Sequence, residues 1–211
     1  MNEFAHPIAR NLLKIKAVRF NFNEPFTWTS GIKSPVYCDN RLSLSYPELR
    51  NMIRDAYVKT VQDYFPDVEV IAGVATGAIA QGALVADRLD KSLIYIRDKA
   101  KDFGLKKSIE GEIKKGQKVV IIEDLVSTGK SSLKAFEELR NVGADVLGMV
   151  AILSYNLPIA EKRFKDSNLT LITLSTFSIL MEEALQGGYI TEEESDKLDK
   201  WCKSIDSEEM K

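Results

Sequence analysis

Short apolar runs recur through the middle of the chain and predict the strands of a buried sheet. The runs are rich in Val and Ile and do not alternate cleanly with polar residues, which is typical of strands buried on both faces of a parallel sheet. They cover residues 68–75, 92–96, 118–125, 146–153 and 169–174. Residues 78–89 and 131–143 place apolar side chains three and four positions apart, which predicts helices. Gly143 is typical of a helix C-terminus. The alternation predicts a doubly wound α/β sheet, with ligands at the carboxyl ends of its strands.

The two ends of the chain follow a different pattern and predict an accessory layer beside the sheet. Residues 5–17 and 46–65 have helical periodicity, and they flank a polar stretch at 27–41. Two further helices are expected at about 178–187 and 191–202. Thr191 and Glu194 form a capping-box pattern at the start of the second.

Composition and charge narrow the class of protein. The chain has 211 residues, of which 45% are hydrophobic and 28% charged, enough for one good core and about one domain. A net charge of -2 gives no electrostatic footprint for nucleic acid, so any bound anion must be held by local groups. The N-terminus lacks a basic region followed by an apolar run, and no apolar stretch approaches ~20 residues. We therefore expect a cytoplasmic protein with no secretory signal, no membrane span and no nucleic-acid partner.

Cysteine and histidine are too few for several kinds of site. Cys38 and Cys202 are the two cysteines and lie outside metal-ligand spacing, so neither a disulfide framework nor a zinc site is expected. The single histidine, His6, precedes Pro7 and is expected to be a surface or capping residue. Unless His6 takes part, Ser–His–Asp hydrolysis and multi-histidine metal sites are excluded.

The most informative segment is KVVIIEDLVSTGKSS, residues 118–132. An apolar strand ends in two adjacent carboxylates, Glu123 and Asp124, and the short loop 127–129 then enters a helix. The loop hydroxyls, the free N–H groups of the helix start and the helix dipole predict a phosphate cradle. Carboxylates next to that cradle suit sugar hydroxyls, which donate hydrogen bonds to them. One segment can therefore bind both ends of a phosphorylated sugar.

Two other interpretations of this segment are weaker. A Walker A loop needs Gly five positions before Gly129, where this chain has Asp124. An ordinary turn with a good N-cap accounts for Ser and Thr, but it does not account for an acidic pair at the end of an apolar strand.

The segment VVIIEDLVSTGKSS resembles the signature that binds phosphoribosyl pyrophosphate (PRPP) in type I phosphoribosyltransferases. The resemblance implies an α/β fold with a central, mainly parallel sheet flanked by helices. It also implies one domain over 1–211, with a PRPP-binding core at about 66–175 and a small hood from about 1–45 and the C-terminal segment. By matched positions, the acidic pair holds the ribose hydroxyls and 127–131 hold the 5-phosphate. The implied PRPP-binding residues of this segment are Glu123, Asp124, Leu125, Val126, Ser127, Thr128, Gly129, Lys130 and Ser131.

Residues 29–41, TSGIKSPVYCDNR, resemble the base-recognition stretch of the orotate phosphoribosyltransferases within that superfamily. The matched positions imply that Tyr37 and Cys38 lie against the orotate ring, with Lys33 nearby and the Ser127 hydroxyl in contact with the base. Orotate is a planar anion, which hydroxyls and a cation suit. Taken alone, Tyr37 and Cys38 are equally compatible with ordinary packing.

Two more segments resemble the pyrophosphate-binding parts of the same family. Residues 96–111, IRDKAKDFGLKKSIEG, are similar to its mobile catalytic loop, and residues 73–80, GVATGAIA, to its pyrophosphate loop. The ordinary interpretation of 96–111 is a solvated charged loop, and that of 73–80 is a plain turn. The implied pyrophosphate contacts are Thr76, Gly77, Arg97, Lys101 and Phe103. The implied catalytic residues are Arg97, Lys99, Lys101 and Asp124.

The resemblance implies transfer of the phosphoribosyl group of PRPP to orotate, giving orotidine 5-phosphate and pyrophosphate on the path to UMP. It implies Mg²⁺ bound mainly through PRPP and water, no metal site of the protein's own, and a homodimer with shared active sites. Two alternatives stay open. One is a phosphoribosyltransferase for another base, which the 29–41 segment argues against. The other is a PRPP-binding regulator without turnover, favoured by Phe103, where the family usually has His, and by Asp98, where some members have Lys.

Overall fold

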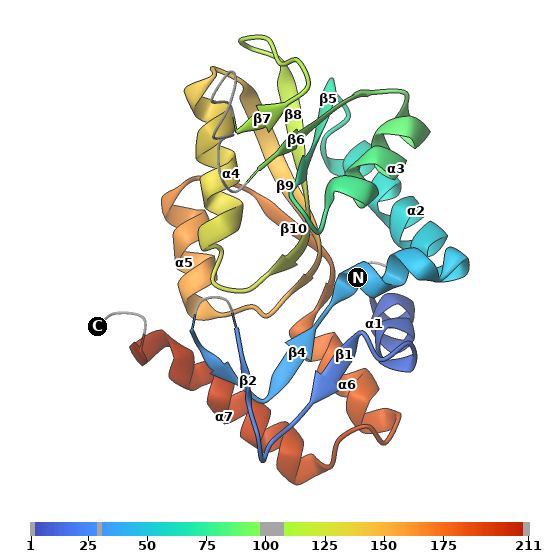
Figure 1. Cartoon of the computed structure of the whole chain (residues 1–211), viewed down its shortest axis with the longest axis vertical. Coiled ribbons are helices and arrows are strands. Elements are labelled where there is room, and N and C mark those ends of the chain that lie inside the picture. The colour runs from blue at the N-terminus through green and yellow to red at the C-terminus, as the bar shows by residue number, and fades with distance from the viewer. Residues whose placement is uncertain (1–2, 29–30, 98–107, 209–211) are drawn as a thin grey trace.

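A six-stranded sheet with helices on both faces forms the centre of the protein (Figure 1). The computed structural model describes residues 3–28, 31–97 and 108–208. The strands of the sheet are β5 (Val70–Val74), β6 (Ser92–Ile96), β7 (Ile109–Glu110), β8 (Lys118–Val126), β9 (Asp145–Ser154) and β10 (Leu171–Thr176). Their order is β10-β9-β8-β5-β6-β7, and all neighbours are parallel except β6 and β7. The predicted α/β fold with a mainly parallel sheet is confirmed.

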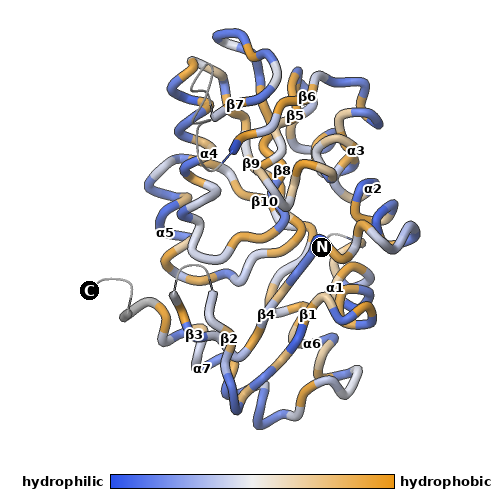
Figure 2. The backbone as a smooth tube through the Cα atoms, viewed as in Figure 1, coloured by the Kyte–Doolittle hydropathy of each residue, from blue (hydrophilic) through white to orange (hydrophobic). Residues whose placement is uncertain are grey.

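The two faces of the sheet carry separate hydrophobic cores. The helices are α1 (Ala5–Lys14), α2 (Pro47–Tyr64), α3 (Ile79–Leu89), α4 (Lys130–Asn141), α5 (Pro158–Asp166), α6 (Phe177–Gln186) and α7 (Glu192–Glu208), with a 3₁₀ helix, η1 (Asn40–Ser45). Successive strand residues point to opposite faces. In β8, Val120 and Ile122 therefore pack in the core with α1, α2, α3 and α6, whereas Val119 and Ile121 pack in the core with α4 and α5. Burial on both faces explains why the central strands are continuously apolar (Figure 2).

The strand order reverses at the boundary between β5 and β8. The chain passes from β5 to β6 on one side and later returns to β8 on the other side of β5. Loops that follow β5 and β8 therefore leave in opposite directions and open a crevice at the carboxyl edge, where α/β sheets bind ligands. The loop at 75–78 and the loop at 127–129 flank this crevice.

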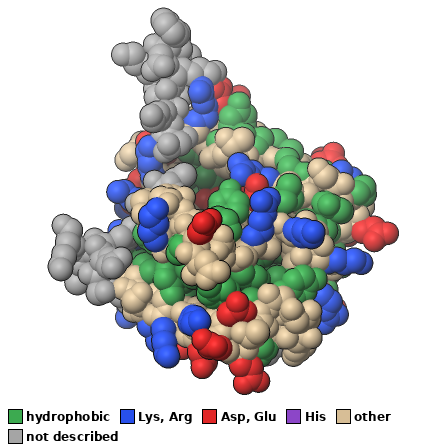
Figure 3. All heavy atoms as spheres, turned by 60° about the horizontal axis from the view of Figure 1, so that its bottom comes forward, with side chains coloured by type: hydrophobic (Ala, Val, Ile, Leu, Met, Phe, Trp, Pro, Cys, Tyr) green, Lys and Arg blue, Asp and Glu red, His purple; other side chains and the backbone are tan. Residues whose placement is uncertain are grey.

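Two small antiparallel sheets lie beside the main sheet, near α7 (Figure 1). They pair β1 (Val18–Phe20) with β4 (Val36–Cys38), and β2 (Phe26–Thr27) with β3 (Lys33–Ser34). Trp201 of α7 donates from Nε1 to the carbonyl of Lys33 at 2.9 Å and meets Trp28 edge-on at 5.5 Å between ring centroids. We call these four strands and α7 the hood. The face in Figure 3 intersperses Lys and Arg with Asp and Glu.

Several local expectations from the sequence hold. Thr191 and Glu194 exchange capping-box hydrogen bonds, and Gly143 follows α4 with φ +81°. His6 is a partly exposed residue within α1, where its Nδ1 lies 3.0 Å from Glu183 Oε1. Arg10 also binds Glu183, so His6 and Arg10 together tie α1 to α6.

No helix in the described ranges is long and apolar enough to cross a membrane.

We expect Gly148→Ala to destabilise the fold by ~1–3 kcal/mol, the usual cost of overpacking a core. Gly148 lies within β9, and a Cβ atom there would be 2.4 Å from Cζ of Phe65 and 3.2 Å from the carbonyl of Thr170. Urea unfolding measures the change. In a Phe65→Leu background the same substitution is expected to cost less. An equal cost in both backgrounds would show that the Phe65 ring is not the obstacle.

Candidate functional site

The loop after β5 lies against one carboxylate of β8. A Cβ atom placed on Gly77 would lie 2.1 Å from Oδ2 of Asp124, so the Asp124 carboxylate occupies the space that any side chain at position 77 requires. Thr76 precedes it and is exposed. The fold therefore brings the 73–80 segment and the acidic pair together, although some 50 residues separate them.

The loop after β8 presents backbone N–H groups. Gly129 has φ +78°, in the left-handed region that favours glycine, and α4 starts immediately after it. Among the described residues, no group accepts a hydrogen bond from the N–H groups of residues 128–132. These donors stand at a helix N-terminus, where the dipole adds positive potential. Thr128 is 4% exposed, whereas Lys130 and Ser131 are exposed. The predicted phosphate cradle therefore has the donors it requires.

The two carboxylates of β8 lie close to each other but contact different neighbours. Glu123 is 4% exposed, and its carboxylate accepts from Ser132 Oγ and from the backbone N–H of Asp124, each at 3.0 Å. Glu123 thus faces the start of α4, while Asp124 faces Gly77. Burial raises the pKa of Glu123 well above its usual value, and the charge of Asp124 adds to this. Burial also raises the pKa of Asp124, although Arg41 acts in the opposite direction.

Buried side chains hold the backbone that carries this acidic pair. Tyr57, fully buried in α2, donates its hydroxyl to the carbonyl of Glu123. Asn40, 2% exposed, donates from Nδ2 to the carbonyl of Asp124 at 2.7 Å. Sequence reasoning did not single out either residue. Asn40 stands at the end of the 29–41 segment, which was a usable signal, but Tyr57 looks like any aromatic residue of an amphipathic helix.

Three of the four predicted base-binding residues lie on β3 and β4, and the fourth, Ser127, follows β8 and is partly buried. Tyr37 is half-buried and packs on Phe26 with 5.6 Å between ring centroids, and Lys33 donates from Nζ to Thr27. Cys38 is buried, and its thiol lies 3.1 Å from Oδ1 of Asn40. Successive residues of a strand face opposite sides, so Tyr37 and Cys38 do not present their side chains to one surface. A contact of both with one base stays a prediction.

On the other side of the crevice lies Arg97, at the end of β6. With Ala75 and Ser131 it lines a small hollow of about 20 Å³, so the segments after β5 and β6 and the start of α4 converge there. Its guanidinium is 3.5 Å from Glu110, and its N–H donates to the carbonyl of Ser108 at 2.7 Å. The predicted loop residues Lys99, Lys101 and Phe103 lie outside the described residues, as does Asp98.

Comparisons with known proteins agree on one family. Residues 45–186 match the family described as the phosphoribosyl transferase domain. The chain is 51% identical to the orotate phosphoribosyltransferase of Porphyromonas gingivalis, over 93% of this chain and 94% of that protein. The chain belongs to the orotate phosphoribosyltransferase family.

Solved structures of related proteins have the same fold. The structure of orotate phosphoribosyltransferase from Aeropyrum pernix superposes with a TM-score of 0.75 at 28% identity, covering 87% of this chain and 99% of that one. Leishmania donovani UMP synthase gives 0.80 at 28% identity, and the match covers 93% of this chain and 42% of that longer chain. The crevice described above therefore lies in an orotate phosphoribosyltransferase fold.

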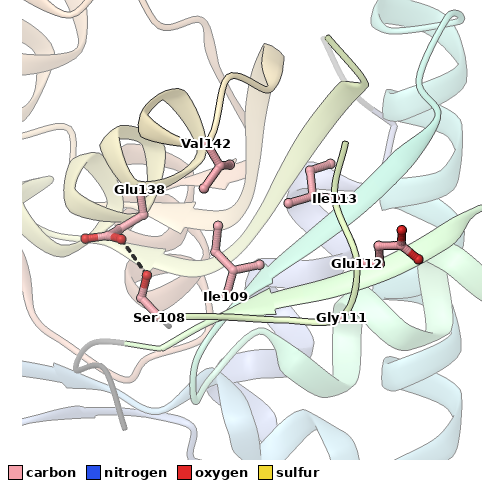
Figure 4. A pocket seen from close by; sticks show the side chains of 7 residues that line it. All are labelled: Ser108, Ile109, Gly111, Glu112, Ile113, Glu138 and Val142. Atoms are coloured by element: carbon pink, nitrogen blue, oxygen red, sulfur yellow. Dashed lines mark hydrogen bonds between the residues drawn. The ribbon is translucent and has the colours of Figure 1, made fainter. Parts of the chain in front are cut away.

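A larger hollow in this orotate phosphoribosyltransferase fold lies away from the acidic pair. It has a volume of about 370 Å³ and lies between β7, the turn after β7 and α4. Figure 4 shows its lining, in which Ser108 hydrogen-bonds Glu138. Among the described residues, none of the catalytic or binding residues implied by the resemblance lines this hollow. The Ser108 contact instead ties the predicted catalytic loop, residues 96–111, to α4.

We expect Glu123→Gln to raise the melting temperature at neutral pH. The pKa of Glu123 is raised in the folded protein, so the unfolded chain loses the carboxyl proton at a lower pH than the folded chain does. The free energy of unfolding therefore falls as pH rises from the usual pKa of 4.5 to the raised pKa. Gln is never charged, and it keeps both hydrogen bonds if the Ser132 hydroxyl accepts instead of donating.

Melting temperatures of both proteins from about pH 5 to about pH 8 measure this effect. The advantage of the variant should grow with pH. The exposed exchange Glu137→Gln on α4 is the matched control, for which we expect no such trend. A wild-type protein that gains stability relative to Glu123→Gln as pH rises would contradict the prediction.

Proposed function

We propose that this chain transfers the 5-phosphoribosyl group of PRPP to orotate, giving orotidine 5-phosphate and pyrophosphate in pyrimidine synthesis. This makes it a pentosyltransferase, the reaction class of its family. The observation that supports it best is the meeting of Asp124 with the Gly77 loop, beside a row of backbone donors at the start of α4. A sugar that carries a phosphate at one end and a diphosphate at the other fits that arrangement.

The proposed division of labour follows the geometry of the crevice. The loop at 127–131 would hold the 5-phosphate through its N–H groups and hydroxyls. Glu123 and Asp124 would accept from the ribose hydroxyls, with Asp124 the more accessible of the two. Thr76, Gly77 and Arg97, with Lys101 from the catalytic loop, would bind the pyrophosphate.

The chemical step needs no nucleophile from the protein. The bond between the anomeric carbon and the pyrophosphate oxygen breaks, and positive charge builds on the ribose ring. A ring nitrogen of orotate forms the new bond and gives up its proton, which the departing pyrophosphate can accept. Asp124 would stabilise the ring charge, and Arg97, Lys99 and Lys101 would neutralise the leaving group. Positioning and the exclusion of water account for the rest of the acceleration.

Mg²⁺ fits this site as a companion of PRPP. Among the described residues, no group of three or more His, Cys, Asp or Glu side chains could hold a metal ion. Asp124 is the carboxylate that faces the crevice, since Glu123 is turned toward Ser132. Diphosphate oxygens and water would supply the other ligands that Mg²⁺ prefers. The ion would neutralise charge on the departing pyrophosphate.

The base would lie between the crevice and the hood. Tyr37 and Lys33 of the hood, with the Ser127 hydroxyl at the foot of the phosphate loop, are the proposed contacts. Arg41 is a further cation in this region, because its charge lowers the pKa of Asp124. A cation and hydroxyls suit the carboxylate and carbonyls of orotate.

Loss of orotate absorbance on adding PRPP and Mg²⁺ tests the reaction. We expect turnover by the intact chain. For Glu123→Gln with Asp124→Asn we expect a loss in kcat/KM of ~1.5–3 kcal/mol per carboxylate, the scale of hydrogen bonds to charged groups. Asp63→Asn, an exposed exchange on α2, is the control. Consumption of another base would indicate the alternative transferase, and PRPP binding without turnover would indicate a regulator.

The proposed homodimer has its own test. If Lys101 serves the neighbouring active site, Lys101→Ala and Asp124→Asn homodimers are both poor, because every site lacks one part. In a mixed dimer one site carries both defects and the other carries none. After subunit exchange we expect recovery of up to about a quarter of wild-type activity, since C₂ dimers form at random and half of them hold one intact site. If subunit exchange is proven and activity does not recover, the catalytic loop serves the active site of its own subunit.

A further inference from the structure

A side chain of α5 holds the phosphate loop from behind. Arg163 donates from Nη1 to the carbonyl oxygen of Thr128 at 2.9 Å. We propose that Arg163 is a positioning residue that sets the direction of the Gly129 N–H group and so prepares the loop for the 5-phosphate. The proposal rests on the proposed function, in which residues 127–131 bind that phosphate.

The geometry of one peptide unit connects Arg163 to the phosphate. The carbonyl of Thr128 and the N–H of Gly129 belong to the same peptide bond, which is trans. In a planar trans peptide these two groups point in opposite directions. Because the guanidinium fixes the carbonyl on the α5 side, the N–H of Gly129 points away from α5 and toward the start of α4, where the other free donors lie.

This peptide needs a side chain to hold it. Two nearby carbonyls are fixed by backbone donors instead: that of Val126 accepts from the N–H of Tyr155 at 3.0 Å, and that of Gly129 accepts from the N–H of Leu133 at 2.9 Å. Gly129 has no Cβ to limit its rotation and sits at φ +78°. Without Arg163 the 128–129 peptide has less to prevent it from turning its carbonyl, a hydrogen-bond acceptor, toward the phosphate.

Helix α5 also closes the space behind the loop. A Cβ atom on Gly129 would lie 3.0 Å from Cε2 of Phe164 and 3.8 Å from Cα of Ala160. The loop therefore packs on α5, and Arg163 adds a hydrogen bond to that packing. Its permanent positive charge also polarises the peptide, which strengthens the Gly129 N–H as a donor to an anion.

Binding measurements with two small anions distinguish this role of Arg163 from a general effect of lost charge or lost folding. Ribose 5-phosphate probes the cradle, and pyrophosphate probes the opposite side of the crevice. For Arg163→Met we expect about ten- to hundredfold weaker binding of ribose 5-phosphate, as for loss of one charged hydrogen bond. We expect a similar rise in KM for PRPP, with kcat, KM for orotate and pyrophosphate binding nearly unchanged. Arg163→Lys keeps the positive charge and a donor group, so its affinity for ribose 5-phosphate should lie between those of the wild type and Arg163→Met.

Lys165→Met is the matched control, because it removes the same charge from an exposed position of the same helix. It should leave ribose 5-phosphate binding unchanged. Wild-type affinity for ribose 5-phosphate in folded Arg163→Met would overturn the proposal, as would an equal loss for pyrophosphate or an equal effect of Lys165→Met. If Arg163→Met does not fold, the same comparison in Arg163→Lys decides. Orotate turnover by the intact chain tests the proposed function separately, since ribose 5-phosphate binding does not require it.

Discussion

Two neighbouring carboxylates at the end of a buried strand are the constraint on which the rest of the site depends. Burying charge is costly unless the charge is paired or hydrogen-bonded. The chain limits that cost with Ser132 and a backbone N–H on Glu123, while Tyr57 and Asn40 fix the two carbonyls. The raised pKa of Glu123 shows that the cost is not fully offset. A group retained at the expense of stability is expected where binding requires it.

The order of strands explains how segments distant in sequence reach these carboxylates. Because β5 and β8 are neighbours at the reversal of strand order, the loop at 75–78 and the loop at 127–129 open onto one crevice. Arg97 arrives from the adjacent β6, and η1 brings Asn40 from the opposite side. The hood is then fastened to the same strand end through Asn40, which contacts both Cys38 and Asp124. The proposed base site and the proposed sugar site therefore share one support, Asn40.

What the sequence predicted depends on how local the signal is. The central strands were predictable because burial on both faces makes them continuously apolar, and the strand, loop and helix at 118–141 because their signals are contiguous in sequence. The hood strands are two or three residues long, too short for periodicity, and α5 was not predicted. Tyr37 and Cys38 were paired by sequence matching, yet the alternation of β4 places them on opposite faces. Tyr57 and Arg163 act through hydrogen bonds across 66 and 35 residues, which no local pattern reveals.

The phosphate loop shows how a fold keeps binding groups free. Buried backbone groups are normally paired, so a row of N–H donors without acceptors is costly unless a ligand or water takes them. Around this loop the carbonyls of Val126, Thr128 and Gly129 accept from Tyr155, Arg163 and Leu133, whereas the N–H groups of residues 128–132 have no acceptor among the described residues. Holding one end of a planar peptide fixes the other. The donors are then oriented in advance, so binding of the proposed phosphate would cost less conformational entropy.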